Sequence, residues 1–418
     1  MIVNAKDCDI LRELGKQVKE VAMLPVQQET IRLWKASNDL KQVRPMVMID
    51  DLPWHEMDID GELKLKTEDI FCRGIEERLR RTLYSWKYMR ADMVVEPYVD
   101  ITKIFYGADF GISTIEQTAA TDPNNGVLSH HYIDQLQTEE DIEKIRMPEI
   151  VYDEKATVKN EEMAHYIFDG ILDIRMQGYI PGMWGYIPFF APWDRIAEWR
   201  GVQNVLYDLV DRPDFLHKIM SRLTDAHLSM LDQLEAKGLL SYGQGIVHCS
   251  GAYTDELPAP GFDPQHTRAK DVWTFGAAQM FSTVSPAMHN EFELDYAKKW
   301  YSRFGLVSYG CCEPLHDKID IIREIPNLRK ISMSPWVDVE KGAERIGRDF
   351  VFTRKPNPAL LAGTAWEPDA VERDLKDTMT KCKRHGCVVQ FILKDVSTIK
   401  YEPQRLREWV DIAMRVVE

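Results

Sequence analysis

Short apolar runs alternate with amphipathic segments throughout the second half of the chain, and this alternation restricts the fold more than any other feature. The apolar runs predict strands at residues 306–310, 329–334, 349–353 and 387–393. The segments between them predict helices, and the clearest is residues 369–386, which ends at a glycine. Strands that are separated by helices form βαβ units, which build parallel sheets.

The first half of the chain continues this pattern with longer helices. Residues 67–92 and 212–238 predict helices, and further strands are predicted at residues 94–99, 178–184 and 245–250. A total near eight strands favours an α/β fold of the (β/α)8 TIM-barrel type over an open doubly wound sheet. No Gly/Ser-rich linker divides the chain. We therefore predict one barrel domain over residues 1–418, in which residues 1–90 form a mainly helical N-terminal extension plus the first strand.

The charge and the cysteine content of the chain indicate which partners the protein can bind and in which cellular compartment it resides. The net charge is −15, from 52 basic and 67 acidic residues, which argues against binding to nucleic acid or to an anionic membrane surface. The seven cysteines are odd in number and show no disulfide spacing, as is usual for reduced thiols. The N-terminus has no apolar core of a secretory signal. We expect a cytoplasmic protein.

Reactive side chains follow the predicted strand at residues 306–310, at the strand end where the active site of a barrel lies. They are Cys311, Cys312 and Glu313. Thiolate and carboxylate groups are zinc ligands, but zinc sites usually show spaced cysteine pairs. The alternative is that the thiols pack as small buried hydrophobic groups. Neighbouring strand residues point to opposite faces, so we expect at most one of the two thiols in the lumen.

Other polar residues at predicted strand ends are candidates for acid–base chemistry. His248 suits an acid, a base, a ligand or a satisfied core histidine. Asp100 and Asp395 end two strands, where a partly desolvated carboxyl group donates a proton near neutral pH, or where it caps the next segment. Tyr309 ends the strand that precedes the thiols.

Aromatic side chains crowd three segments at predicted strand ends, residues 48–58, 182–194 and 333–338. The candidates for a ligand-binding wall are Trp54, His55, Trp184, Tyr186, Phe189, Trp193 and Met333. Aromatic walls with few polar groups suit a flat, apolar ligand. Packing of the core and rim remains the alternative interpretation.

Taken in order, these segments resemble the uroporphyrinogen decarboxylase-like superfamily over nearly the whole chain. The segment "MVVEPYVDITKIFYGADFG" resembles the family strand that ends in an active-site aspartate, which would be Asp100. The segments "LVSYGCCEPLHDKIDII" and "VVQFILKDVSTIKYEPQRLREWV" are similar to late βα units of that family. The resemblance implies a (β/α)8 barrel and is compatible with a homodimer.

Departures from the family pattern narrow the activity that the resemblance implies. True decarboxylases carry an arginine-rich loop after the first strand, whereas this chain has "DDLPWHEMD" there. Thiol-methylating members hold zinc with a His-X-Cys pair and a later Cys, and the matching positions here are Tyr309, Cys311 and Asp395. The chain therefore resembles the remaining branch of the family, the methyltransferase component of anaerobic aryl O-demethylases such as veratrol O-demethylase.

This last resemblance implies a specific reaction. The enzyme would cleave a methoxylated aromatic compound and transfer the methyl group to cobalamin or another cobalt(I) corrinoid on a separate carrier protein. The candidate proton donors for the leaving phenolate are Tyr309, Glu313, His248, Asp100 and Asp395. Three alternatives stay open: a decarboxylase, a zinc-dependent thiol methyltransferase, and a binding protein without turnover.

Overall fold

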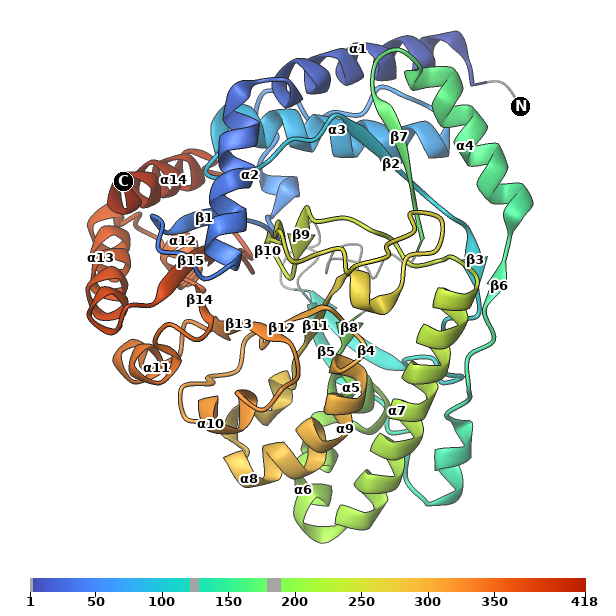
Figure 1. Cartoon of the computed structure of the whole chain (residues 1–418), viewed down its shortest axis with the longest axis vertical. Helices are drawn as coiled ribbons and strands as arrows, with labels where there is room; N and C mark the ends of the chain where they lie inside the picture. Colours follow the sequence, from blue (N-terminus) through green and yellow to red (C-terminus); the bar gives the residue numbers. More distant parts are fainter. Residues whose placement is uncertain (1–2, 121–127, 179–188) are drawn as a thin grey trace.

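The structure of the chain is a computed structural model that describes residues 3–120, 128–178 and 189–418. Its largest element is a parallel sheet of seven strands, in which neighbours along the chain are mostly neighbours in space (Figure 1). In sheet order the strands are β1 (Met46–Ile49), β15 (Val388–Leu393), β14 (Val351–Arg354), β13 (Leu328–Met333), β12 (Leu306–Tyr309), β11 (Trp273–Gly276) and β8 (Phe189–Phe190). The protein is therefore mixed α/β, as predicted.

Helices connect and cover these strands. In the first half they are α1 (Ala5–Ala22), α2 (Pro25–Asn38), α3 (Ile70–Tyr88), α4 (Glu154–Phe168), α5 (Pro192–Arg200), α6 (Val202–Asp211) and α7 (Pro213–Ala236). In the second half they are α8 (Pro286–His289), a π-helical turn at Asn290–Leu294, α9 (Asp295–Tyr301), α10 (Ile319–Ile322), α11 (Val339–Ile346), α12 (Ala359–Ala362), α13 (Pro368–His385) and α14 (Gln404–Val417). Within the described ranges, every helix is too short or too polar to traverse a lipid bilayer.

Local sequence explains the boundaries of these helices. The predicted helix at residues 369–386 is α13, and it ends where Gly386 adopts a left-handed conformation with φ of 72°. Helix α7 begins with Pro213 in its first turn, where a missing N–H costs nothing. Buried apolar residues on one side of α5, α7, α9, α13 and α14 then pack on the sheet and form the main hydrophobic core.

The N-terminal helices belong to a second hydrophobic core. In that core α1, α3 and α4 pack around β2 (Tyr98–Thr102), through residues such as Leu11, Ile75, Val99 and Phe168. Strand β2 pairs in parallel with β7 (Asp173–Gln177) and forms a sheet of its own (Figure 1). The described residues pair β2 neither with β1 nor with β8, so closure into an eight-stranded barrel stays a prediction.

Three short antiparallel pairs interrupt the βα pattern, and the sequence did not predict them. They are β3 (Phe105–Tyr106) with β6 (Val151–Tyr152), β4 (Glu116–Ala120) with β5 (Leu128–Tyr132), and β9 (Ile246–Val247) with β10 (Ser250–Gly251). The prediction of one strand at residues 245–250 is therefore wrong. His248 and Cys249 turn the chain there with φ of 42° and 64°, which an extended strand cannot contain.

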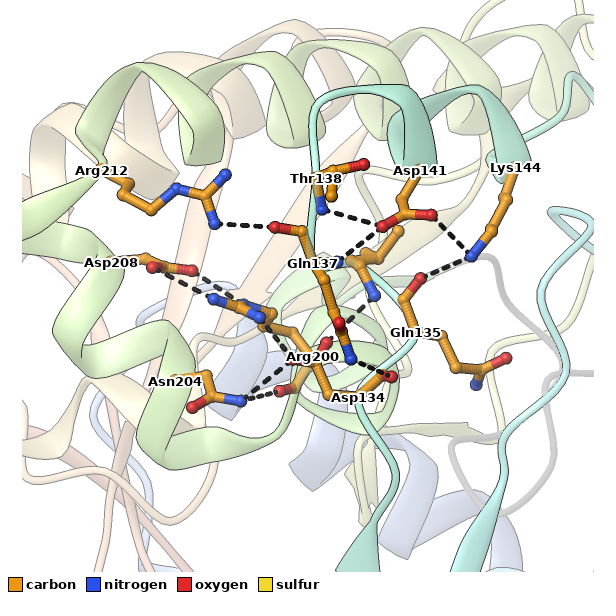
Figure 2. Close-up of polar contacts among 11 residues, drawn as sticks. Asp134, Gln135, Gln137, Thr138, Asp141, Lys144, Arg200, Asn204, Asp208 and Arg212 are labelled. Carbon is orange, nitrogen blue, oxygen red and sulfur yellow. Dashed lines mark hydrogen bonds and ion pairs between the residues drawn. The ribbon is translucent and has the colours of Figure 1, made fainter.

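An ionic network fixes helix α5, which directly follows β8. At its end, Arg200 donates to Asp208 with an Nε–Oδ2 distance of 2.8 Å and also bonds to Asp134 (Figure 2). Asn204 donates to the same Asp134 carboxylate. The Arg200 side chain is only 11% exposed and that of Asp208 only 5%. The network thus ties the segment after β5 to α5 and α6.

We expect Arg200→Met to lower the free energy of unfolding by about 3 kcal/mol, because it leaves two largely buried carboxylates without their partner. Chemical denaturation followed by circular dichroism measures this change. The control is Lys218→Met, which breaks the exposed pair with Glu139 and is expected to cost less than about 1 kcal/mol. Equal effects of the two substitutions would contradict a structural role of the network.

Candidate active site at the carboxyl ends of the strands

Polar side chains follow the strands of the seven-stranded sheet at its carboxyl end. They are Asp50 and Asp51 after β1, Asp194 after β8, Gln279 after β11, Cys311, Cys312 and Glu313 after β12, Ser334 after β13, Lys355 after β14, and Lys394 and Asp395 after β15. In parallel α/β sheets this end carries the ligand site. The residues therefore form a candidate active site.

Two lysines and two thiols form the centre of this site, together with His248 and Asp395, and we call these six residues the thiol–lysine cluster. The Nζ atom of Lys394 lies 3.6 Å from the Sγ atom of Cys311. Lys355 donates to the Cys311 carbonyl at 2.9 Å and to His248 Nε2 at 2.9 Å. Cys312 Sγ lies 3.7 Å from an Asp395 oxygen. Three strands and the β9–β10 turn thus meet at Cys311.

The two thiols lie 3.5 Å apart, so they do not point to opposite faces as neighbouring strand residues would. The reason is that β12 ends at Tyr309 and Gly310 turns the chain with φ of 94°. A hydrogen bond with the Cys312 thiol lowers the pKa of Cys311 against the effect of burial, and Lys355 and Lys394 lower it further, to about 6. Cys311 is therefore mostly a thiolate at neutral pH, while the pKa of Cys312 is raised.

Backbone strain is concentrated at the same place. His248, Cys249, Asp51 and Asp395 all have positive φ, from 42° to 64°, although none of them is glycine. Such conformations are costly and collect at functional sites. The His248 ring stacks on Phe275 at 3.8 Å, and burial lowers its pKa well below the ordinary value, so the imidazole is neutral.

Two carboxylates beside the cluster differ in their surroundings. Glu313 accepts the backbone N–H groups of Cys311, at 2.9 Å, and of Ala278, at 3.3 Å. Asp194, in the first turn of α5, accepts a hydrogen bond from Gln279 at 3.0 Å. Burial raises the pKa of Asp194 to about 7 against this hydrogen bond, and the negative charges of Glu313 and Cys311 add to the increase. Asp194 is thus half protonated near neutral pH.

Two further acids of the site, Asp50 and Asp51 after β1, also have raised pKa values. Burial raises the pKa of Asp51, and a hydrogen bond with Asp395 raises it further. Burial also raises the pKa of Asp50. These acids and Asp194 give the site several carboxyl groups that hold a proton above the ordinary pH range of an aspartate.

The structure brings together some of the residues that the sequence singled out. His248, Glu313 and Asp395 lie in or beside the thiol–lysine cluster. Phe189 packs against the apolar group that contains Cys311. Trp193 is fully buried against Phe281, 4.7 Å between ring centres. Trp184 and Tyr186 lie outside the described residues, so their predicted roles are not tested.

Other predicted site residues lie elsewhere. The Tyr309 hydroxyl bonds to His289, at 2.6 Å, and to Glu293, at 3.0 Å, so its ring faces the helices and not the thiols. The Met333 sulfur faces Gly342 of α11. Trp54 and His55 belong to a 3-10 turn at Trp54–Glu56, where Trp54 packs on Tyr84 of α3 and His55 on Tyr401.

Asp100 lies in the middle of β2 and not at its end, contrary to the prediction. Its carboxylate is held by Arg175, with an Nε–Oδ1 distance of 2.6 Å, and by Gln177 at 2.9 Å. Beside it, a cavity of about 480 Å³ opens between β1 and β2. Its walls combine apolar side chains such as Met48 and Val99 with charged ones such as Arg78 and Arg175, and the cavity adjoins the site through β1.

Zinc binding finds no support in the described part of the chain. No group of three or more histidine, cysteine, aspartate or glutamate side chains within the described ranges is arranged to hold a metal ion. The thiolate of Cys311 has lysines as its charged neighbours, and a cation would have to displace them.

The sequence analysis missed three residues of the site, Asp194, Gln279 and Lys355. Asp194 is the first charged residue after the uncharged stretch at residues 176–193, which is a signal that could have drawn attention to it. Lys355 sits in the unremarkable segment "TRKPN", and nothing in the sequence shows that its ammonium group is buried.

Comparisons with known proteins give a likeness in structure but none in sequence. No protein-family model and no curated protein matches the chain. A methyltransferase from Methanosarcina mazei has a similar course of the chain, with a TM-score of 0.49 and 12% sequence identity, over 92% of this chain and 97% of that one. Because the likeness is this weak, the function has to be argued from the site.

Proposed function

We propose that the protein is a methyltransferase that cleaves an aryl methyl ether and passes the methyl group to a cobalt(I) corrinoid on a separate carrier protein. The observation that carries the proposal is the carboxyl group of Asp194, whose pKa is raised to about 7 beside Glu313 and the thiolate of Cys311. The sequence resemblance to the O-demethylase branch points to the same reaction.

A proton donor is what this reaction needs from the protein. Reduced corrinoids supply a strong nucleophile, but an aryl methyl ether has a poor leaving group. The methyl–oxygen bond breaks, and the departing phenolate oxygen takes the proton of Asp194, which regains one from water. A donor works best when its pKa lies near the working pH, and this condition holds for Asp194.

Neighbouring residues support this role of Asp194. Gln279 orients its carboxyl group, while burial, helped by the negative charge of Glu313, raises its pKa. Phe189, which packs against the apolar group that contains Cys311, offers a surface on which an aromatic ring can lie. In this proposal Asp51 is the second candidate donor, because burial and a hydrogen bond with Asp395 raise its pKa as well.

Apolar side chains in the loops at this end of the sheet suit the approach of a carrier protein. Ile59, in the loop after β1, is 61% exposed, and Trp336, in the loop after β13, is 68% exposed. Exposed aromatic and aliphatic residues are typical of protein contact sites. The corrinoid would enter with its carrier as a substrate, so this proposal assigns no residue of this chain as a cobalt ligand.

An anaerobic optical assay tests the proposal. The purified protein is mixed with cobalt(I) cobalamin and with veratrole-like and guaiacol-like ethers. We expect loss of the cobalt(I) absorption, with one phenol released for each methylcobalamin formed. Protein without an ether, and ether without protein, are the controls. Absence of methyl transfer from every ether in the panel would refute the proposal.

Decarboxylation of a small organic acid is the second candidate function, because one observation favours it. Two buried lysines, Lys355 and Lys394, lie at the carboxyl ends of β14 and β15, where they could face an anionic substrate. The sequence had indicated no basic lumen. Release of carbon dioxide from a panel of aromatic acids, without any corrinoid, would favour this function over methyl transfer.

A further inference from the structure

Two adjacent cysteines with unequal surroundings form a feature that the proposed methyl transfer does not use. Cys311 is 1% exposed, whereas Cys312 is partly exposed to solvent. Their sulfur atoms lie 3.5 Å apart. One thiol is thus shielded and the other accessible, and the two are close enough to react with each other after a small movement.

The surroundings of Cys311 stabilise a thiolate and hold it in place. The Lys394 ammonium group lies 3.6 Å from its sulfur, while Lys355 fixes its carbonyl group and Glu313 its N–H group. Thiolates beside cationic groups are the reactive form of cysteine. Cys312 stays protonated, because its hydrogen bond with Cys311 and burial raise its pKa, and the Asp395 carboxylate, 3.7 Å from its sulfur, adds to this effect.

We propose that Cys311 and Cys312 form an oxidation site for small hydroperoxides, which closes to a disulfide between the two adjacent residues. The Cys311 thiolate attacks the terminal oxygen of the hydroperoxide, the O–O bond breaks, and the alcohol or water leaves with one proton. This step produces a sulfenic acid on Cys311. The Cys312 sulfur then attacks the Cys311 sulfur, the S–O bond breaks, and water leaves with the Cys312 proton.

The product is a strained disulfide. Adjacent Cα atoms are about 3.8 Å apart across a trans peptide, which is shorter than the roughly 4.4–6.8 Å usual for disulfides. Strained disulfides are easily reduced, so a mild thiol reductant reverses the modification. Oxidation also removes the negative charge that Lys394 and Lys355 surround, which changes the electrostatics of the site beside Asp194.

Oxidation of the reduced full-length protein with hydrogen peroxide tests this inference without any ether or corrinoid, so its failure is separate from a failure of the proposed function. We expect a mass loss of two hydrogen atoms, a Cys311–Cys312 crosslink in peptide mapping, and recovery with a mild thiol. The rate should rise with pH through about 6, because the thiolate fraction of Cys311 rises there.

Three variants assign the roles. Cys312→Ser is expected to stop at a sulfenic acid that a dimedone-type reagent traps, and Cys311→Ser is expected to lose the reaction. Cys382→Ser is the matched control, because Cys382 and Cys387 form another close thiol pair but both are buried. Unchanged oxidation of Cys311→Ser, or a crosslink that maps to Cys382–Cys387, would overturn the inference.

Discussion

Replacing Asp194 with asparagine is expected to lower kcat for ether cleavage by about 10²- to 10⁴-fold, the usual contribution of a positioned proton donor. Asparagine keeps the size of the side chain and can still accept the hydrogen bond from Gln279. What it lacks is the acidic proton. The cobalt(I) cobalamin assay measures the loss directly, and circular dichroism shows that the variant is folded.

The pH profile separates proton donation from a structural role. A donor acts only when protonated, so the activity of the parent protein should fall as the pH rises through about 7, the pKa of Asp194. This alkaline limb should be absent in Asp194→Asn. The loss should also be smaller for ethers of more acidic phenols, because their phenolates leave with less help from a proton.

Gln279→Ala provides the matched control. Its amide hydrogen bond is the largest effect that lowers the pKa of Asp194, so its removal should move the alkaline limb to higher pH while activity at acidic pH is retained. Full activity in Asp194→Asn would contradict the assignment. Asp51, whose pKa is also raised, would then be the donor to examine.

The regular part of the fold could be predicted from the sequence because its signals are local. The predicted strands at residues 306–310 and 387–393 are β12 and β15, and the predicted helix at residues 212–238 is α7. Buried parallel strands are continuous apolar runs, and their helices carry apolar residues at a spacing of three to four. Short antiparallel pairs such as β9 and β10 carry no such signal, since two residues cannot show a period.

The site could be predicted only in part, because burial and charge pairing are not local properties. The sequence placed Cys311, Glu313 and Asp395 correctly at strand ends. It could not show that the turn at Gly310 brings the two thiols together, or that Lys355 donates to the carbonyl group of Cys311. The raised pKa of Asp194 depends on burial and on Glu313 and Cys311, which are more than a hundred residues away in the chain.

Glu313→Gln is expected to have the second large effect, because Glu313 acts on both reactive groups of the site. Its two carboxylate oxygens accept the N–H groups of Cys311 and Ala278. An amide can accept only one of them and turns its own N–H donors toward the other. An unsatisfied buried N–H group should lower the free energy of unfolding by about 1–3 kcal/mol.

The loss of charge in Glu313→Gln should shift the pKa values of two groups in the same direction, which a purely structural effect would not do. The negative charge of Glu313 raises the pKa values of both Asp194 and Cys311, so its removal should lower both. The alkaline limb of methyl transfer should therefore move to lower pH, and the oxidation rate of Cys311 should also begin to rise at lower pH.

A site that has merely loosened would admit water, which would weaken the influence of Lys355 and Lys394 and raise the pKa of Cys311 toward that of a free thiol. The control is Glu324→Gln, which removes an equal charge from an exposed pair with Lys298 and should shift neither profile. Profiles that move in opposite directions would show that Glu313 only shapes the turn, whereas a joint shift to lower pH would show that one buried charge sets the protonation of both groups.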